Sequence, residues 1–170
     1  VSDIMYIRSP VESSDSKIGF LPGDADEKLK YYNLPFADKL DELLSKPSIE
    51  SLNNQGRLQS HPLSFVRGMS WNCKAIILDE AQNCTQKEIV TLMTRIGEFS
   101  KCFILADPDQ SDLAFGKAGG FEKLQSIFCD EDSKERGIYS FHFTEDDIKR
   151  SDLVKFIVKK LKTFSPALRV

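Results

Sequence analysis

The feature that most constrains the fold is a run of apolar residues at 75–78 that leads directly into the adjacent carboxylates of Asp79 and Glu80. A continuous apolar run of this length is typical of a strand that is buried on both faces of a parallel sheet. In open α/β sheets, ligands bind beyond the carboxyl ends of the strands. The two acids therefore stand where chemistry is expected, although the same pattern also fits a loop that simply follows a core strand.

The two carboxylates suit different tasks. Asp79 is well placed to hold a hydrated Mg²⁺, because a divalent cation beside it keeps the carboxylate ionised. Glu80 is one residue further on, so its side chain points to the other side, where it can accept a proton from an attacking water.

A second apolar run, at 101–106, also ends in polar residues, at 107–110. Between the two runs, Thr85 and Glu88 have the spacing of a capping box that starts a helix. The apolar residues that follow recur at helical spacing and are expected to face the sheet, namely Ile89, Leu92, Met93 and Ile96. Gly97 is expected to end this helix. A helix of this length suits the crossover between two neighbouring parallel strands.

Three consecutive motifs then carry a resemblance to a known family, namely IILDEAQN at 76–83, LMTRIG at 92–97 and ADPDQSDL at 106–113. They resemble the Walker B motif, the helix after it and the Asp-x-x-Gln motif of the PhoH-like ATPases. That family is a branch of the P-loop NTPases related to the helicase ATPase core. The resemblance continues into GFLPGD at 19–24, FVRG at 65–68 and FHFTEDDIKR at 141–150, so it covers nearly the whole chain.

The resemblance implies an α/β fold, a three-layer P-loop NTPase core of the RecA-like type with a largely parallel sheet, formed by residues 1–170 as one domain. It implies ATP and Mg²⁺ as cofactors and ATP hydrolysis coupled to work on RNA or another single-stranded nucleic acid, including strand separation. It also implies a ring-shaped homo-oligomer in the full-length form.

The resemblance assigns roles to individual residues. Asp79 would hold the metal and Glu80 would activate water. Gln110 would sense the γ-phosphate, because an amide can both donate to a phosphate oxygen and accept from water. Arg150 would stabilise the charge of phosphoryl transfer, and its alternative is a salt bridge to Asp146 or to the neighbouring Asp147.

Three further residues are expected at the nucleotide: Arg67, Gln82 and Asp107. Arg67 matches an arginine typical of the family that reaches phosphate or nucleic acid, and its alternative is a solvated position at a turn. Gln82 would relay the nucleotide state to the neighbouring strand, and its alternative is a hydrogen bond at the approach to the next helix.

The P-loop pattern G-x-x-x-x-G-K-[ST] does not occur in the sequence. Residues 116–120 are glycine-rich, but the lysine directly follows the first glycine and no Ser or Thr follows the lysine. Because the family carries its P-loop N-terminal to the matched part, the fold is expected to be incomplete at its N-terminus. The chain would be the C-terminal part of a PhoH-like domain, separated from a longer chain or descended from a split one.

Two other functions fit the same residues. A non-catalytic interaction or regulatory module that has lost its P-loop is the main alternative to the ATPase. A metal-dependent nuclease is less favoured, because two carboxylates are few for a two-metal site.

Composition sets limits on partners and location. The net charge of −3 gives no global basic field, so nucleic-acid binding would require a local patch. The four cysteines have no C-x-x-C spacing, which favours free thiols in a reducing cytoplasm. No apolar run is long enough to span a membrane.

The N-terminal part is expected to form a strand at 3–7, a short helix ending at 32, a helix opened by Pro35, a mobile surface excursion at 46–60 and a strand at 63–66. The C-terminal part is expected to form a helix at 120–128, an acidic loop at 129–136, a last strand at 137–143 and a helix at 151–164 with its apolar side inward.

Overall fold

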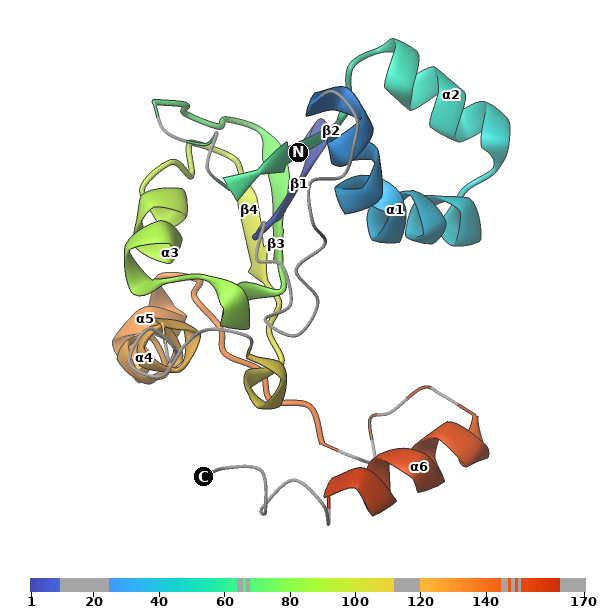
Figure 1. The fold of residues 1–170 in the computed structure, drawn as a ribbon. Coiled ribbons are helices and arrows are strands. Elements are labelled where there is room, and N and C mark those ends of the chain that lie inside the picture. Colours follow the sequence, from blue (N-terminus) through green and yellow to red (C-terminus); the bar gives the residue numbers. More distant parts are fainter. Residues whose placement is uncertain are drawn as a thin grey trace. The chain divides into compact units, whose positions relative to one another are not determined.

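The computed structural model describes residues 1–9, 25–63, 66, 68–111, 120–144, 147, 149 and 151–162 (Figure 1). The chain divides into two compact units, Val1–Ile127 and Phe128–Val170. The first unit holds the sheet and the helices that pack on it.

Four parallel strands form the sheet, in the order β2-β1-β3-β4. They are β1 (Asp3–Arg8), β2 (Leu58–Pro62), β3 (Lys74–Asp79) and β4 (Lys101–Ile104). The register aligns Arg8 with Asp79, and Leu78 with Ile104. The predicted α/β fold with a parallel sheet is therefore confirmed, and the carboxyl ends of β1, β3 and β4 lie at one edge.

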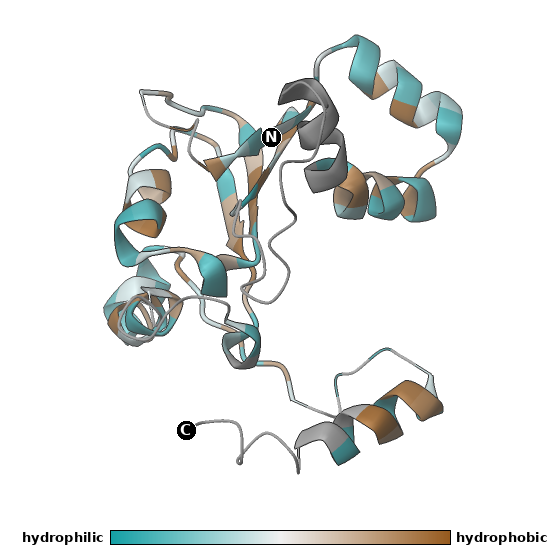
Figure 2. Cartoon of the chain, viewed as in Figure 1, coloured by the Kyte–Doolittle hydropathy of each residue, from teal (hydrophilic) through white to brown (hydrophobic). Residues whose placement is uncertain are grey.

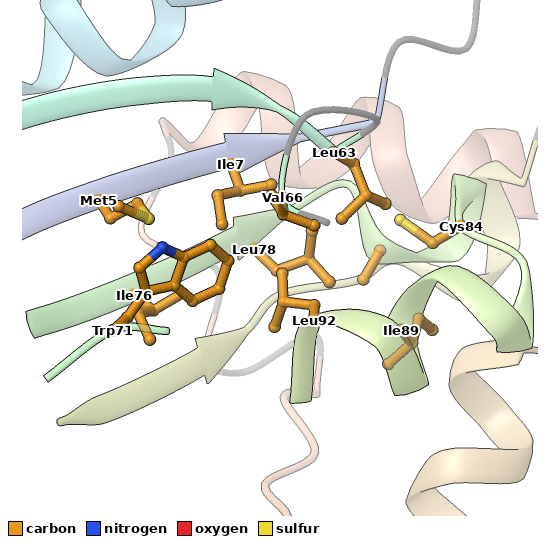
Figure 3. Close-up of a cluster of buried hydrophobic side chains, with 11 residues drawn as sticks. Met5, Ile7, Leu63, Val66, Trp71, Ile76, Leu78, Cys84, Ile89 and Leu92 are labelled. Carbon is orange, nitrogen blue, oxygen red and sulfur yellow. The ribbon is translucent and has the colours of Figure 1, made fainter. Parts of the chain in front are cut away.

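The hydrophobic core lies on one face of this sheet (Figure 3). Successive residues of a strand point to opposite faces. Alternate residues of β1 and β3 therefore enter the core, where they meet Trp71 and one side of α3 (Gln86–Met93). The strand and helix residues in the core are at most 1% exposed, namely Met5, Ile7, Ile76, Leu78, Ile89 and Leu92. Ala75 and Ile77 are only partly buried. The expectation that this strand is buried on both faces was therefore wrong for the face opposite the core.

Helix α3 begins as the sequence predicts. Thr85 is its N-cap, and the reciprocal bonds with Glu88 form a capping box. The helix ends at Met93, earlier than expected, because the chain turns back and Ile96 forms a parallel bridge with Trp71. Ile96 is thus 37% exposed instead of lying in the core.

Helix α1 (Ala25–Leu43) contacts β2 and the face of the sheet opposite α3 (Figure 1). Phe36 stacks on Tyr6 of β1, with ring centroids 4.9 Å apart and planes 4° from parallel. The two helices expected on either side of Pro35 are one continuous helix with Pro35 inside it. A proline inside a helix removes one backbone donor and crowds the carbonyl group of the preceding turn, which weakens a helix, but α1 continues through Pro35.

The segment at 46–60 lies at the surface as expected, with no buried residue, but it forms a regular helix and a strand where a mobile excursion was expected. Helix α2 (Lys46–Asn54) starts with a proline in its first turn, and its half-buried Ile49 and Leu52 are one turn apart. Strand β2 follows at Leu58–Pro62. Of the strand expected at 63–66, Leu63 and Val66 do not belong to a strand, and residues 64–65 lie outside the described part of the chain. An edge strand is held by backbone pairing with its neighbour, here β1. Its side chains therefore need not alternate between apolar and polar residues, which is the pattern that would predict a strand.

The second unit differs from expectation in three places. The acidic segment at 129–136 contains a short helix, α5 (Glu131–Glu135), with Asp130 as its N-cap. Residues 137–143 form no strand within the described part of the chain, and three of their aromatic side chains are well exposed, namely Tyr139, Phe141 and Phe143. An alternating pattern marks which side chains share a face but does not provide a neighbouring strand.

Helix α6 (Asp152–Lys162) forms as predicted, within about two residues of its expected end. Four of its apolar residues are exposed instead of inward, namely Leu153, Val154, Phe156 and Ile157. Figure 2 shows that part of α6 consists of hydrophobic residues. None of the helices that the structure describes is both long enough and apolar enough to cross a membrane.

Candidate functional site

The candidate site lies at the edge of the sheet where β1 and β3 end and where the chain leaves β4. Asp79 is the last residue of β3, and Arg8, the last of β1, is its neighbour in the register. The next residue, Glu80, leads into a 3₁₀ turn, η2 (Ala81–Asn83). A second 3₁₀ turn, η3 (Pro108–Gln110), follows β4.

The Asp79 carboxylate accepts two hydrogen bonds. The Tyr6 hydroxyl donates to Oδ2 at 2.5 Å, and the backbone N–H of Glu80 donates to Oδ1 at 3.0 Å. Tyr6 is 5% exposed, and burial together with the adjacent carboxylate raises the pKa of its phenol. Tyr6 therefore stays a neutral donor that fixes the position of Asp79.

Glu80 has left-handed backbone dihedral angles, with φ of 55° and ψ of 41°. A non-glycine residue in this region stores roughly 1–3 kcal/mol of strain, and such residues concentrate at functional sites. The carboxylate of Glu80 is engaged at both oxygens. Gln82 Nε2 donates to Oε2 at 2.6 Å, and Arg8 Nη2 lies 3.6 Å from Oε1.

Gln82 connects the ends of β3 and β4. Its side chain is buried, and its Oε1 accepts from the backbone N–H of Asp107 at 3.1 Å while its Nε2 donates to Glu80. Its backbone carbonyl also accepts from the Ser111 hydroxyl at 3.1 Å. The amide thus bonds the carboxylate of Glu80 on one side and the turn after β4 on the other.

Asp107 and Gln110 form the part of the site that follows β4. Gln110 Nε2 donates to Asp107 Oδ2, and both residues are exposed. Their exposure leaves these side chains accessible to a ligand at the end of the sheet.

The structure thus brings five of the seven predicted site residues into one connected network, namely Asp79, Glu80, Gln82, Asp107 and Gln110. The other two, Arg67 and Arg150, lie outside the described residues, as do most of the glycine-rich residues 116–120.

Sequence reasoning missed Tyr6 and Arg8. The two residues are two apart on a strand, so they share a face, and they end the first apolar run of the chain. That spacing could have indicated them, but only the pairing of β1 with β3 shows that they meet Asp79 and Glu80.

The donor set suits a magnesium ion that a nucleotide brings with it. Among the described residues, no group of three or more His, Cys, Asp or Glu side chains could hold a metal by itself. Mg²⁺ commonly takes one or two carboxylates together with water and substrate phosphates. A single half-buried carboxylate at a strand end, Asp79, is compatible with this type of binding.

Comparison with known proteins gives a consistent result. A family model described as PhoH-like protein matches residues 1–162. A PhoH-like protein of Synechocystis is 31% identical over 157 residues, which cover 92% of this chain and 47% of that protein. A PhoH-like protein of Bacillus subtilis is 33% identical over 159 residues, which cover 94% of this chain and 48% of that protein. Protein PhoH of Escherichia coli is 31% identical over 153 residues, which cover 89% of this chain and 42% of that protein. The chain therefore spans about half the length of these relatives.

Proposed function

This chain belongs to the PhoH-like protein family, and from that membership we propose that it forms the metal-holding and water-activating part of an ATP-hydrolysing domain. One observation carries the proposal. The acids that end β3 are joined through Gln82 to the turn that ends β4, so a ligand at this edge of the sheet meets both groups together.

Asp79 and Glu80 divide the work in this proposal. Asp79 holds Mg²⁺, with Tyr6 fixing the carboxylate from the neighbouring strand. The ion, when bound, neutralises charge on the phosphates that undergo transfer. Glu80 is the proton acceptor for the attacking water. Asp79 still belongs to strand β3, whereas the left-handed backbone of Glu80 begins the turn that leads into η2.

Gln110 and Asp107 detect the nucleotide. An exposed amide beside the strand end can exchange its bond with Asp107 for one with a phosphate oxygen, without any change in charge. Gln82 bonds the backbone of Asp107, so a shift of this turn reaches Glu80 through one side chain.

The phosphate cradle is the part that these residues do not supply, since the P-loop pattern is absent from the sequence. We infer that catalysis requires a P-loop from a segment outside the 170 residues. The family resemblance makes two further predictions: that ATP hydrolysis is coupled to work on RNA, and that the full-length protein assembles into a ring.

The test is release of phosphate from ATP with Mg²⁺, with and without RNA, by this chain and by the longest natural protein that contains it. Glu80→Gln and Asp79→Asn are the site variants, and Glu98→Gln, which alters an exposed carboxylate away from the site, is the matched control. We expect turnover in the longer protein, unchanged in the control and reduced at least about a hundredfold in Glu80→Gln, as for loss of a general base.

Turnover that survives in Glu80→Gln would contradict the role of Glu80. Absence of turnover in the longer protein would remove the ATPase proposal and favour the non-catalytic interaction module.

A further inference from the structure

Both oxygens of the Glu80 carboxylate have a side-chain partner, so the carboxylate is directed toward protein groups. Its Oε2 accepts from Gln82 at 2.6 Å, and its Oε1 faces the Arg8 guanidinium at 3.6 Å. A general base must direct an unoccupied lone pair at the proton that it removes. We propose that Arg8 is a positioning residue that, with Gln82, holds Glu80 in a resting position and releases it when nucleotide engages the turn after β4. This inference rests on the proposed ATPase function.

Arg8 reaches Glu80 because of the strand register. Arg8 is the neighbour of Asp79 in the sheet and lies two residues after Tyr6 on the same face of β1. Strand β1 therefore supplies one partner to each acid: the phenol of Tyr6 to Asp79 and the guanidinium of Arg8 to Glu80.

The two contacts differ in strength. Tyr6 is buried and its bond to Asp79 measures 2.5 Å, which suits a fixed metal ligand. Arg8 and Glu80 have side chains 29% and 37% exposed and are separated by more than a hydrogen-bond distance. A partly exposed ion pair of this kind opens at little cost. The metal-holding acid is thus fixed, whereas the water-activating acid is held by a contact that can be exchanged.

Gln82 provides the connection that would trigger release. Its Oε1 accepts from the backbone N–H of Asp107, and Asp107 bonds the exposed amide of Gln110. A phosphate that draws Gln110 or Asp107 toward it pulls on the same side chain that bonds Glu80 Oε2. Loss of that bond leaves Arg8 as the remaining described contact that holds the carboxylate in place.

The experiment measures ATP hydrolysis by the longest natural protein that contains this chain, as wild type and as Arg8→Gln, Arg8→Lys and Arg57→Gln. Arg57 is the matched control, because it pairs with Asp3 at the opposite end of the same strand. We expect Arg8→Gln to raise kcat several-fold in the absence of nucleic acid with KM unchanged. Arg8→Lys, which keeps a cation beside Glu80, should retain the wild-type rate, and so should Arg57→Gln.

Hydrolysis by Arg8→Gln at or below the wild-type rate would overturn the proposal. A rise in KM at constant kcat would also overturn it, because that result would make Arg8 a substrate-binding residue. Equal acceleration in Arg57→Gln would show a general effect of lost charge and would overturn it too.

A second measurement separates this inference from the ATPase proposal. Thermal unfolding of the 170-residue chain is compared among wild type, Arg8→Gln, Glu80→Gln and the double variant. A double-variant shift smaller than the sum of the single shifts supports the pair whether or not hydrolysis is detected. Additive shifts show that the two side chains do not interact and overturn the inference, even if the longer protein is an active ATPase.

Discussion

The hydroxyl of Tyr6 donates to Oδ2 of Asp79 at 2.5 Å, although the two residues are 73 positions apart in the sequence. This bond joins β1 to the acid at the tip of β3, and the ring of Tyr6 is fixed from the other side by stacking on Phe36. The position of the candidate metal ligand thus depends on three segments that meet only in the folded chain.

Replacement of Tyr6 by Phe should remove this bond and leave the stacked ring in place. Hydrogen bonds to charged groups contribute about 1.5–3 kcal/mol, and Asp79 keeps its bond from the Glu80 backbone, so we expect a loss of about 1.5–2 kcal/mol in the free energy of unfolding. Urea denaturation measures this loss in the free energy of unfolding. Tyr139→Phe, at a residue 63% exposed, is the matched control and should be neutral. Equal effects of the two variants would refute a special contribution of the Tyr6 hydroxyl.

Gly97 is required by a close approach of two backbone segments. A Cβ at this position would lie 2.0 Å from Asn72 Oδ1 and 2.6 Å from the carbonyl oxygen of Trp71, which also accepts the Gly97 N–H. Gly97→Ala must displace backbone, so we expect a loss of about 3 kcal/mol or more.

Gly56→Ala is the comparison for Gly97→Ala. Gly56 has a φ of 66° but open space around its Cβ position, so it should lose only about 1 kcal/mol from conformational strain. Thermal or urea unfolding ranks the two variants. The reverse order would show that the segment at Trp71 adjusts easily and that the close approach is not a constraint.

The four thiols should divide into two pairs in their reactivity. Burial raises the pKa of the Cys84 thiol to about 12 and that of Cys102 to about 11, whereas Cys73 and Cys129 are exposed. Because the thiolate is the reactive form, iodoacetamide at pH 8 should modify Cys73 and Cys129 and leave the other two unmodified until the chain unfolds. Peptide mapping by mass spectrometry gives the result. Rapid labelling of Cys84 would mean that the core around it opens readily.

Asp3 should make stability depend on pH in the acid range. The hydrogen bond from Lys74, at 2.9 Å, is the main cause that lowers the pKa of the Asp3 carboxyl from its usual 3.8. Since the folded state holds the proton less tightly than the unfolded state, this stabilisation is fully present above about pH 4 to 5 and is lost as the pH falls through the folded pKa.

Asp3→Asn tests this dependence. Its melting temperature should lie below that of the wild type at pH 6 and approach the wild-type value near pH 2. Asp38→Asn, which changes an exposed carboxylate on α1, is the control and should differ little from the wild type at either pH. A constant gap between Asp3→Asn and the wild type across this range would exclude the proposed linkage.

The elements that could be predicted from the sequence are those with a local signal. The apolar runs before Asp79 and Asp107 indicate β3 and β4, and the spacing of Thr85 and Glu88 indicates the start of α3. Parallel strands place the polar residues after them at one edge, so five candidate site residues could be grouped from the sequence alone.

The remaining features depend on partners that are distant in sequence. Strand β2 exists because β1 pairs with its backbone, and a sequence such as LQSHP carries no alternation that indicates it. Arg8 and Tyr6 could not be assigned to the site without the strand order, which places β1 beside β3. For residues 137–143, alternating aromatic side chains led to a strand that has no neighbour within the described chain.

Strand β4 ends the sheet, so one side of its backbone faces no described strand. Its residue Phe103 and the following Leu105 are 50% and 48% exposed, on the face that α3 does not cover. An exposed apolar edge strand is a template for pairing with other polypeptides, including identical copies. Self-association of these 170 residues by themselves should therefore increase with concentration and weaken when Phe103 is replaced by lysine, because a charge at an edge opposes the addition of another strand.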